Sequence, residues 1–220
     1  MTEFKIKQTE LSETLEQVGD PAGLIRWAKR EEMDITETEI RRGSLQEADF
    51  SQLVFENVRF DHCIAEQAAM KNCTFRNVVF QGCRFPGCDF SESFFDQCRL
   101  EACQLTGADF RDNRLSNVVF SGCALKYVNF ADSKWEKIRL KDCDLSEAFF
   151  SSCRIKQIEL SRCSFVQAEF FKTPLKGIDF TDCTLDGIRL SEGKSELKGA
   201  IVSSYQAAEL ARLLGVIIKE

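Results

Sequence analysis

Residues 88–110 read CDFSESFFDQCRLEACQLTGADF and repeat a five-residue pattern. A large apolar residue stands at every fifth position from Phe90 to Phe110, and a small residue such as Cys88 or Ala108 often stands two places before it. A period of five is neither the 3.6 of a helix nor the 2 of a strand. The stretch therefore predicts a regular backbone with a geometry of its own.

The same pattern extends in both directions along the chain. Every position numbered in multiples of five from Ile40 to Leu190 is apolar, and most of the 19 phenylalanines lie at these positions. All 11 cysteines lie two places earlier in the pattern, and they are Cys63, Cys73, Cys83, Cys88, Cys98, Cys103, Cys123, Cys143, Cys153, Cys163 and Cys183.

Two periods together predict the course of the backbone. Residues two apart in an extended segment point to the same side, so the small and the large residue of one quintet face inward together. The chain must turn a corner before the next quintet repeats this arrangement. Cysteines also recur every 20 residues, as in the series Cys63, Cys83 and Cys103. We therefore expect four quintets to form one coil, with like residues stacked.

Several quintets carry a family resemblance. They resemble the pentapeptide repeat, in which Asp or Asn stands between a small residue and Phe or Leu: Ala48-Asp49-Phe50-Ser51, Cys88-Asp89-Phe90-Ser91, Ala108-Asp109-Phe110-Arg111 and Val128-Asn129-Phe130-Ala131. The resemblance implies an all-β fold, a right-handed quadrilateral parallel β-helix, over residues 38–192. With about 4.8 Å between stacked strands, the repeats give about eight coils and a rod about 37 Å long.

Both ends of this solenoid are predicted to be helical caps. In residues 1–37, Leu11, Leu15 and Val18 have the spacing of one helix, and Asp20-Pro21 signals the start of a second. In residues 193–220, Ser204 is the predicted cap of a helix that runs to Leu214. Gly215 would end that helix, and a short strand, Val216-Ile217-Ile218, would follow.

The C-terminal helix has more apolar surface than a single cap needs. Its surplus predicts a homodimer built end to end, since two-fold pairing is the commonest oligomeric arrangement. A monomeric cap packed between solenoid and tail is the alternative. The residues expected at the dimer interface are Tyr205, Leu210, Leu213, Leu214, Val216, Ile217 and Ile218.

A column of amides recurs at one predicted outward corner. Its members, spaced by 20 residues or a multiple, are Asn57, Asn77, Gln97, Asn117 and Gln157. We expect these side chains to hydrogen-bond to one another, as stacked amides do in cross-β ladders.

The cysteines raise two alternatives, a disulfide framework and a metal site. Their odd number and their place in the core pattern argue against disulfides. No Cys-x-x-Cys pair occurs, and the only histidine, His62, lies at an outward corner, so we expect no metal site. We expect the cysteines to be small, buried, unpaired residues beside the phenylalanines.

No motif points to catalysis. The chain has no glycine-rich phosphate loop, no nucleophile elbow and no pair of histidines, so we expect a non-enzymatic protein without a cofactor. No apolar run approaches the length of a membrane span, and Met1-Thr2-Glu3 opens no signal peptide. A cytoplasmic protein is expected.

Charge is unevenly distributed over the predicted faces. The net charge is −6 and the pI is about 5.1, which disfavours direct binding to nucleic acid. Sorting the quintets by face predicts an acidic half and one basic edge. The acidic residues expected to bind a partner are Asp89, Glu92, Asp109, Asp112, Asp132, Asp144 and Glu147.

The tail resembles that of the Qnr-type quinolone-resistance proteins, a group within the pentapeptide-repeat family. The residues that carry this resemblance are Leu197-Lys198-Gly199, Tyr205-Gln206-Ala207, Leu210 and Leu213-Leu214-Gly215-Val216. The resemblance implies binding to DNA gyrase and topoisomerase IV as a mimic of duplex DNA, and with it quinolone resistance. The alternative is a structural or protein-interaction solenoid with another partner. The five-residue pattern has no insertion between Thr38 and Glu192, unlike the pattern of Qnr proteins whose loops interrupt the coils.

Overall fold

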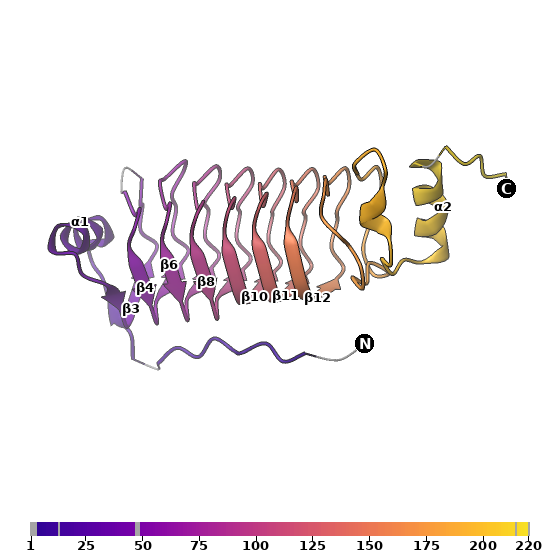
Figure 1. The fold of residues 1–220 in the computed structure, drawn as a ribbon. Coiled ribbons are helices and arrows are strands. Elements are labelled where there is room, and N and C mark those ends of the chain that lie inside the picture. Colours follow the sequence, from indigo (N-terminus) through magenta and orange to yellow (C-terminus); the bar gives the residue numbers. More distant parts are fainter. Residues whose placement is uncertain (1–3, 13, 47–48, 214, 220) are drawn as a thin grey trace.

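The structure is a computed structural model that describes residues 4–12, 14–46, 49–213 and 215–219. The coils stack into a rod with helix α1 (Pro21–Glu31) at one end and helix α2 (Ser204–Leu213) at the other, and the N-terminal segment runs alongside (Figure 1). A short 3-10 helix, η1 (Ser195–Leu197), precedes α2. No helix in the described part of the chain is long and apolar enough to cross a bilayer.

Parallel strands on two neighbouring sides of the rod belong to one 12-stranded sheet. The first side holds β2 (Ile35–Thr36), β4 (Val54–Glu56), β6 (Thr74–Arg76) and β8 (Phe94–Asp96). The second side holds β1 (Glu16–Gln17), β3 (Thr38–Arg41), β5 (Arg59–Asp61), β7 (Val79–Gln81) and β9 (Arg99–Glu101). The longer strands that continue both series are β10 (Arg114–Ser121), β11 (Lys134–Lys141) and β12 (Arg154–Ser161).

The strand register confirms the predicted coil. Phe55 pairs with Phe75 and Phe75 with Phe95, a step of one predicted coil each time. Isolated parallel bridges such as Asp89 to Asp109 keep the same step on the remaining sides. The solenoid completes about seven regular turns, close to the eight expected.

A left-handed backbone conformation turns the corners. It falls two residues after a core position, with φ values of 57° at Asn57, 54° at Gln97 and 56° at Asp112. An L-residue in this conformation brings its Cβ close to the following carbonyl oxygen, which makes it costly except for glycine, Asn and Asp. Most corners nevertheless adopt this conformation, because the hydrogen bonds between coils stabilise the turn.

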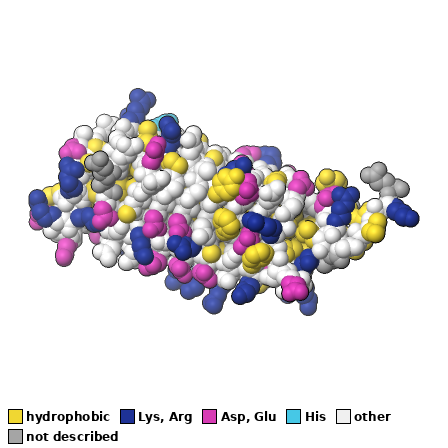
Figure 2. Space-filling model, turned by 90° about the horizontal axis from the view of Figure 1, so that it is seen from above, with side chains coloured by type: hydrophobic (Ala, Val, Ile, Leu, Met, Phe, Trp, Pro, Cys, Tyr) yellow, Lys and Arg dark blue, Asp and Glu magenta, His cyan; other side chains and the backbone are white. Residues whose placement is uncertain are grey.

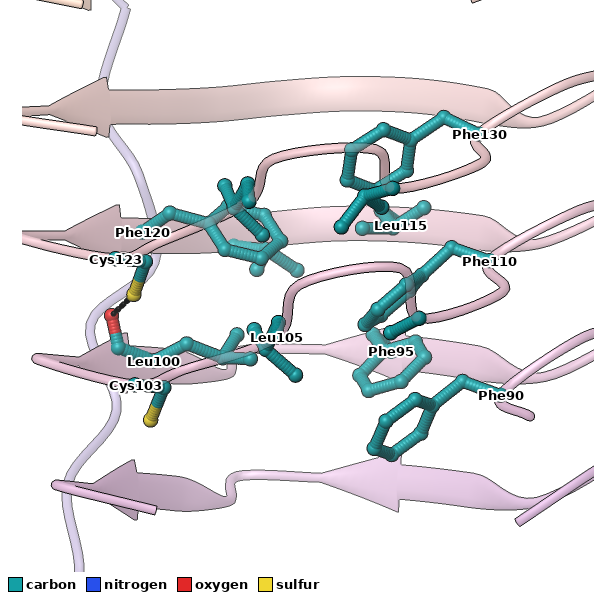
Figure 3. Close-up of a cluster of buried hydrophobic side chains, with 14 of the residues drawn as sticks. Phe90, Phe95, Leu100, Cys103, Leu105, Phe110, Leu115, Phe120, Cys123 and Phe130 are labelled. Carbon is teal, nitrogen blue, oxygen red and sulfur yellow. Dashed lines mark hydrogen bonds between the residues drawn. The ribbon is translucent and has the colours of Figure 1, made fainter. Parts of the chain in front are cut away.

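Aromatic rings fill the core as columns along the rod axis. Phe90, Phe110 and Phe130 lie one above another, with ring centroids 4.8 and 5.3 Å apart (Figure 3). Phe75 and Phe95 stack at 4.7 Å in a neighbouring column. Each buried phenylalanine stabilises the fold by roughly 1.5–3 kcal/mol through the apolar area it removes from water.

The cysteines are free, and all except Cys183 are buried, as predicted. Their thiols also make hydrogen bonds that the repeat pattern does not predict. The Cys123 thiol donates to the carbonyl oxygen of Leu100 in the preceding coil at 3.2 Å (Figure 3), and Cys73 donates to Phe50 at 2.9 Å. Burial raises the pKa of the Cys98 thiol to about 12, so it stays protonated at neutral pH.

One cysteine column contains other buried polar side chains in place of a thiol. Its polar members in the intervening coils are Ser93, Asn113, Ser133 and Thr173. The Ser93 hydroxyl donates to Met70 O at 3.1 Å, and the Thr173 hydroxyl donates to Phe150 O. The column therefore selects a small donor for a core-facing carbonyl, which explains why cysteine, serine and threonine interchange there.

The N-terminal cap differs from the prediction. A helix through Leu11, Leu15 and Val18 was expected, but these residues lie in an extended segment in which β1 pairs with β3. A lone amphipathic helix this short is marginal in water. Hydrogen bonds to the solenoid stabilise the extended form instead. The second helix is confirmed as α1, with the Asp20 carboxylate accepting from Gly23 N at 2.9 Å.

The C-terminal cap is a helix, and its contacts explain its position. Ser203, rather than Ser204, caps α2: its hydroxyl accepts from Gln206 N at 3.2 Å, and the Gln206 side-chain oxygen accepts from Ser203 N at 2.8 Å. The Gln206 amide also donates to Phe180 O at 2.8 Å. This buried glutamine therefore covers carbonyls of the last coil. Residues 215–219 form no strand, so the predicted strand Val216-Ile217-Ile218 is wrong.

The thiols provide a test of the core. We expect the folded chain to react slowly with a thiol reagent at pH 8, because burial blocks access to the thiols and raises the pKa of several of them, such as Cys73 and Cys98. The half-buried Cys183 should react first, and all 11 thiols should react after denaturation. Rapid labelling of most cysteines in the native state would contradict the described core.

Substitution at an inward and an outward position tests the register. Ala108 is fully buried, so Ala108→Arg should bury an unpaired charge and lower the free energy of unfolding by several kcal/mol. Arg111 is exposed, and Arg111→Ala should change it by at most about 0.5 kcal/mol. Thermal unfolding of the two variants measures both effects, and equal losses would mean that the register is misassigned.

Candidate partner-binding faces

Three carboxylates form a column at one corner of the rod. Glu92, Asp112 and Asp132 occupy equivalent left-handed corners of consecutive coils, and all three are exposed. Backbone bonds fix their places, such as Asp112 N to Ala131 O at 3.0 Å. Neighbouring members are about one strand spacing apart, about 4.8 Å. We call these three residues the acidic column.

Asp89 and Asp109 lie beside the acidic column and are half-buried. Their backbones form a parallel bridge, which confirms that they are neighbours in consecutive coils. The Asp89 carboxylate accepts from Ser91 N at 2.9 Å. The Asp109 carboxylate is held by Arg111, whose Nε and Nη2 lie 2.8 and 2.6 Å from Oδ2. Much of the Asp109 charge is therefore neutralised within the chain.

The other two predicted acidic residues lie on the next side of the rod. The Asp144 carboxylate is exposed and accepts from Ser146 N at 2.9 Å. Glu147 is paired with Lys126 at 3.6 Å, as Glu92 is with Lys71 at 2.9 Å. Among the described residues, Asp89, Asp112, Asp132 and Asp144 have no cation within 4.0 Å, so they carry the charge that remains available to a partner.

A basic column lies on the side that follows the acidic column. Arg114 pairs in register with Lys134, and Lys134 with Arg154, so like charges stack in three consecutive strands. These residues line a surface hollow of about 480 Å³ together with Trp135. Figure 2 shows cationic and anionic side chains interspersed on the face that it presents, so this face carries charge of both signs.

The C-terminal end exposes apolar side chains. Tyr205 is 70% exposed and Ile217 88%, and Val216 and Ile218 are exposed beside them. Two other residues expected at the dimer interface pack within the chain: Leu210 is buried against the last coil and Leu213 lies partly buried against the same core. Leu214 lies outside the described residues. The surface available to a second copy is therefore narrower than predicted.

The amide column makes contacts that the sequence did not reveal. Asn77 donates to Asn57 Oδ1 at 2.6 Å, the one bond between two amides of the column among the described residues, so the predicted ladder is confirmed for this pair alone. The backbone of the N-terminal segment also hydrogen-bonds to this column, at Asn77, Gln97 and Asn117. No local pattern in the sequence predicts that the segment lies there. Within the described residues, no group of three or more His, Cys, Asp or Glu is placed to hold a metal ion.

Three solved structures similar to this chain are distant from it in sequence. A trypsin-treated form of QnrB1, described as a plasmid-mediated fluoroquinolone resistance protein, is 17% identical, with 84% of this chain and 98% of that chain covered and a TM-score of 0.45. HetL, described as involved in heterocyst differentiation regulation in the cyanobacterium Nostoc sp. strain PCC 7120, is 17% identical, with coverages of 79% and 88% and a TM-score of 0.47.

A pentapeptide-repeat protein of the Arabidopsis thaliana thylakoid lumen is 20% identical, with coverages of 55% and 82% and a TM-score of 0.33. No curated protein matches the sequence. The family model described as the pentapeptide repeat region matches residues 33–110, 53–130 and 74–150, which together span more than half of the chain. These matches cover strands β2 to β11 and the phenylalanine columns between them, and the chain belongs to the pentapeptide-repeat family.

Proposed function

We propose that this chain is a non-enzymatic binding protein that interacts with a type II topoisomerase, DNA gyrase or topoisomerase IV, through its acidic column. The observation that carries the proposal is the stack of Glu92, Asp112 and Asp132 on a regular rod. Evenly spaced carboxylates along a rod offer a DNA-binding enzyme a surface whose charge is complementary to that of its cationic groove. The tail resemblance to Qnr-type proteins supports the same partner and a role in quinolone resistance in the cytoplasm.

The magnitude of the charge limits the kind of mimicry. A duplex about 37 Å long carries roughly 22 charges, at one per 1.7 Å. The net charge of the whole chain is only −6. The proposed contact therefore depends on local carboxylate columns and on shape, and charge density over the whole rod contributes less.

A second candidate is an interaction solenoid with a different partner. The observation that favours it is the neutralisation of Glu92, Asp109 and Glu147 by cations of the same chain. Such pairs keep a surface soluble without marking a binding site. The two candidates differ in whether topoisomerase binding depends on Asp112 and Asp132.

Charge reversal tests the topoisomerase proposal. We expect Asp112→Lys with Asp132→Lys to lower gyrase affinity at least tenfold and to abolish protection of supercoiling from a quinolone, because both carboxylates are exposed and unpaired. Wild-type binding should weaken with added salt. The measurements are gyrase affinity and a supercoiling assay with the quinolone present.

A matched control separates this site from net charge. Asp186→Lys with Glu192→Lys makes the same change in charge at exposed positions nearer the C-terminal end, and should leave binding unchanged. Absence of wild-type binding would reject the topoisomerase proposal. Equal loss in both double variants would reject the acidic column as its site.

We also propose that the chain pairs with a second copy through Tyr205, Val216, Ile217 and Ile218. The double variant Tyr205→Glu, Ile217→Glu should be monomeric in light scattering, because it places charges in the exposed apolar surface. Its melting temperature should remain close to that of the wild type apart from the loss of dimer stabilisation. A wild-type chain that is monomeric at high concentration would contradict this pairing.

A further inference from the structure

The wall of the solenoid opens at one place near its C-terminal end. We call the strand or strand-like segment on one side of one coil a rung. In the regular coils, backbone bonds such as Gln97 N to Ser116 O at 3.1 Å join each rung to the equivalent rung of the next coil. Among the described residues, no backbone hydrogen bond joins β12 to residues 174–181. The wall closes again at the following corner, where Ser164 bridges to Thr184.

One feature of the sequence, Pro174, accounts for one of the missing bonds. Pro174 occupies the position from which Arg154 N donates to Ser133 O at 3.0 Å one coil earlier, and proline has no N–H to donate. The rung 174–181 keeps backbone bonds on its other side, to the segment before α2, with Leu175 N to Glu196 O at 3.0 Å and Gly177 N to Gly199 O at 2.8 Å. It makes none to β12, which is left without a partner on that side.

The opening uncovers apolar side chains that are buried elsewhere. Ile155, Ile158 and Leu160 of β12 are only partly buried, whereas their equivalents in β11, Trp135 and Ile138 among them, are fully buried. The groove measures about 640 Å³ and is lined by these three residues, by Ile178 and by charged residues at its rim, Glu159, Lys176, Asp179 and Asp182.

The groove also presents an unpaired strand edge. The N–H of Gln157 stands where that of Gln97 bonds to the next rung, and the carbonyl of Ile158 stands where that of Val58 accepts from Val79 N at 3.0 Å. An unpaired edge of this kind is a template for another extended chain. Apolar pockets beside such an edge take the side chains that alternate along the added strand.

The chain's own N-terminal segment already reaches the groove. Its backbone follows the amide column: Asn77 accepts from Glu10 N at 2.9 Å and donates to Glu10 O at 2.7 Å, and Asn117 accepts from Lys7 N at 3.2 Å. The segment thus runs along the rod (Figure 1) and brings Phe4 to the lining of the groove. The structure therefore places an aromatic side chain, carried on an extended segment, at the lining of the groove.

We propose that this groove is a docking site for an extended peptide segment of a partner protein, which adds a strand to β12 and buries an aromatic side chain, and that Phe4 occupies the site in cis. A partner peptide competes with a tethered segment whose effective concentration is in the millimolar range. The N-terminal segment therefore sets the minimum affinity that a partner peptide needs to occupy the groove. This site is separate from the acidic column, and its test does not depend on the topoisomerase proposal.

Fluorescence polarisation with a labelled peptide tests the site. The probe is a hexapeptide with the sequence of residues 1–6, MTEFKI, and its control carries alanine in place of the phenylalanine. The full-length Phe4→Ala variant, whose groove has lost its cis side chain, should bind the probe at least tenfold more tightly than the wild type. The alanine peptide should bind at least tenfold more weakly to that variant.

Adding Ile158→Asp to the Phe4→Ala chain should abolish binding, with folding checked by thermal unfolding. Failure of the probe to bind Phe4→Ala, or equal binding of both peptides, would overturn the proposal.

A measurement on the wild type keeps the proposal testable if a variant does not fold. Hydrogen exchange should show the Gln157 amide exchanging at least 100-fold faster than the Gln97 amide, because only the latter is bonded to the next rung. Equal protection of the two amides would mean that the wall is closed in solution, and the docking site would be rejected.

Discussion

The hydrogen bonds between successive coils are the constraint on which the rest of this structure depends. They repeat at a step of 20 residues, as between Asn57 N and Arg76 O at 3.1 Å and between Asn77 N and Asp96 O at 2.9 Å. That step places like residues above one another, which turns a linear repeat into columns of rings, thiols, amides and charges. Each column repeats its neighbours' environment, so a residue that suits one coil suits the next.

The sequence predicted the columns well and the ends poorly. Core positions such as Phe90 and Phe110 recur with a period of five, which a coil with corners satisfies, so the register follows from inside and outside preferences, whereas the right-handed quadrilateral form was implied by the family resemblance. The extended conformation of residues 4–12 depends on contacts with side chains far along the chain, such as Asn77. The spacing of nearby residues does not predict contacts of this kind. Thus, helical spacing at Leu11 and Leu15 gave the wrong element.

The opened wall shows a different limit. Leu175 and Ile178 keep the apolar pattern and remain buried, although their rung makes no backbone hydrogen bond to β12. The apolar pattern constrains which side chains face inward, but it does not say to which rung the backbone bonds. Candidate sites had the same limit: the sequence identified exposed acids, while the pairing of Asp109 with Arg111 emerged only from the structure. This chain therefore differs from a regular pentapeptide-repeat rod in three features: its surface columns, its N-terminal segment and its open strand edge.

Deletion of one coil tests the 20-residue step most directly. Removing residues 104–123 joins Cys103 to Ala124 and keeps every remaining residue in register, whereas removing residues 104–122 shifts the register by one. Circular dichroism and thermal unfolding of both variants should show a cooperatively folded rod for the first deletion and loss of the cooperative transition for the second, because a shift of one residue turns core side chains outward. Equal stability of the two deletions, or unfolding of both, would contradict the account.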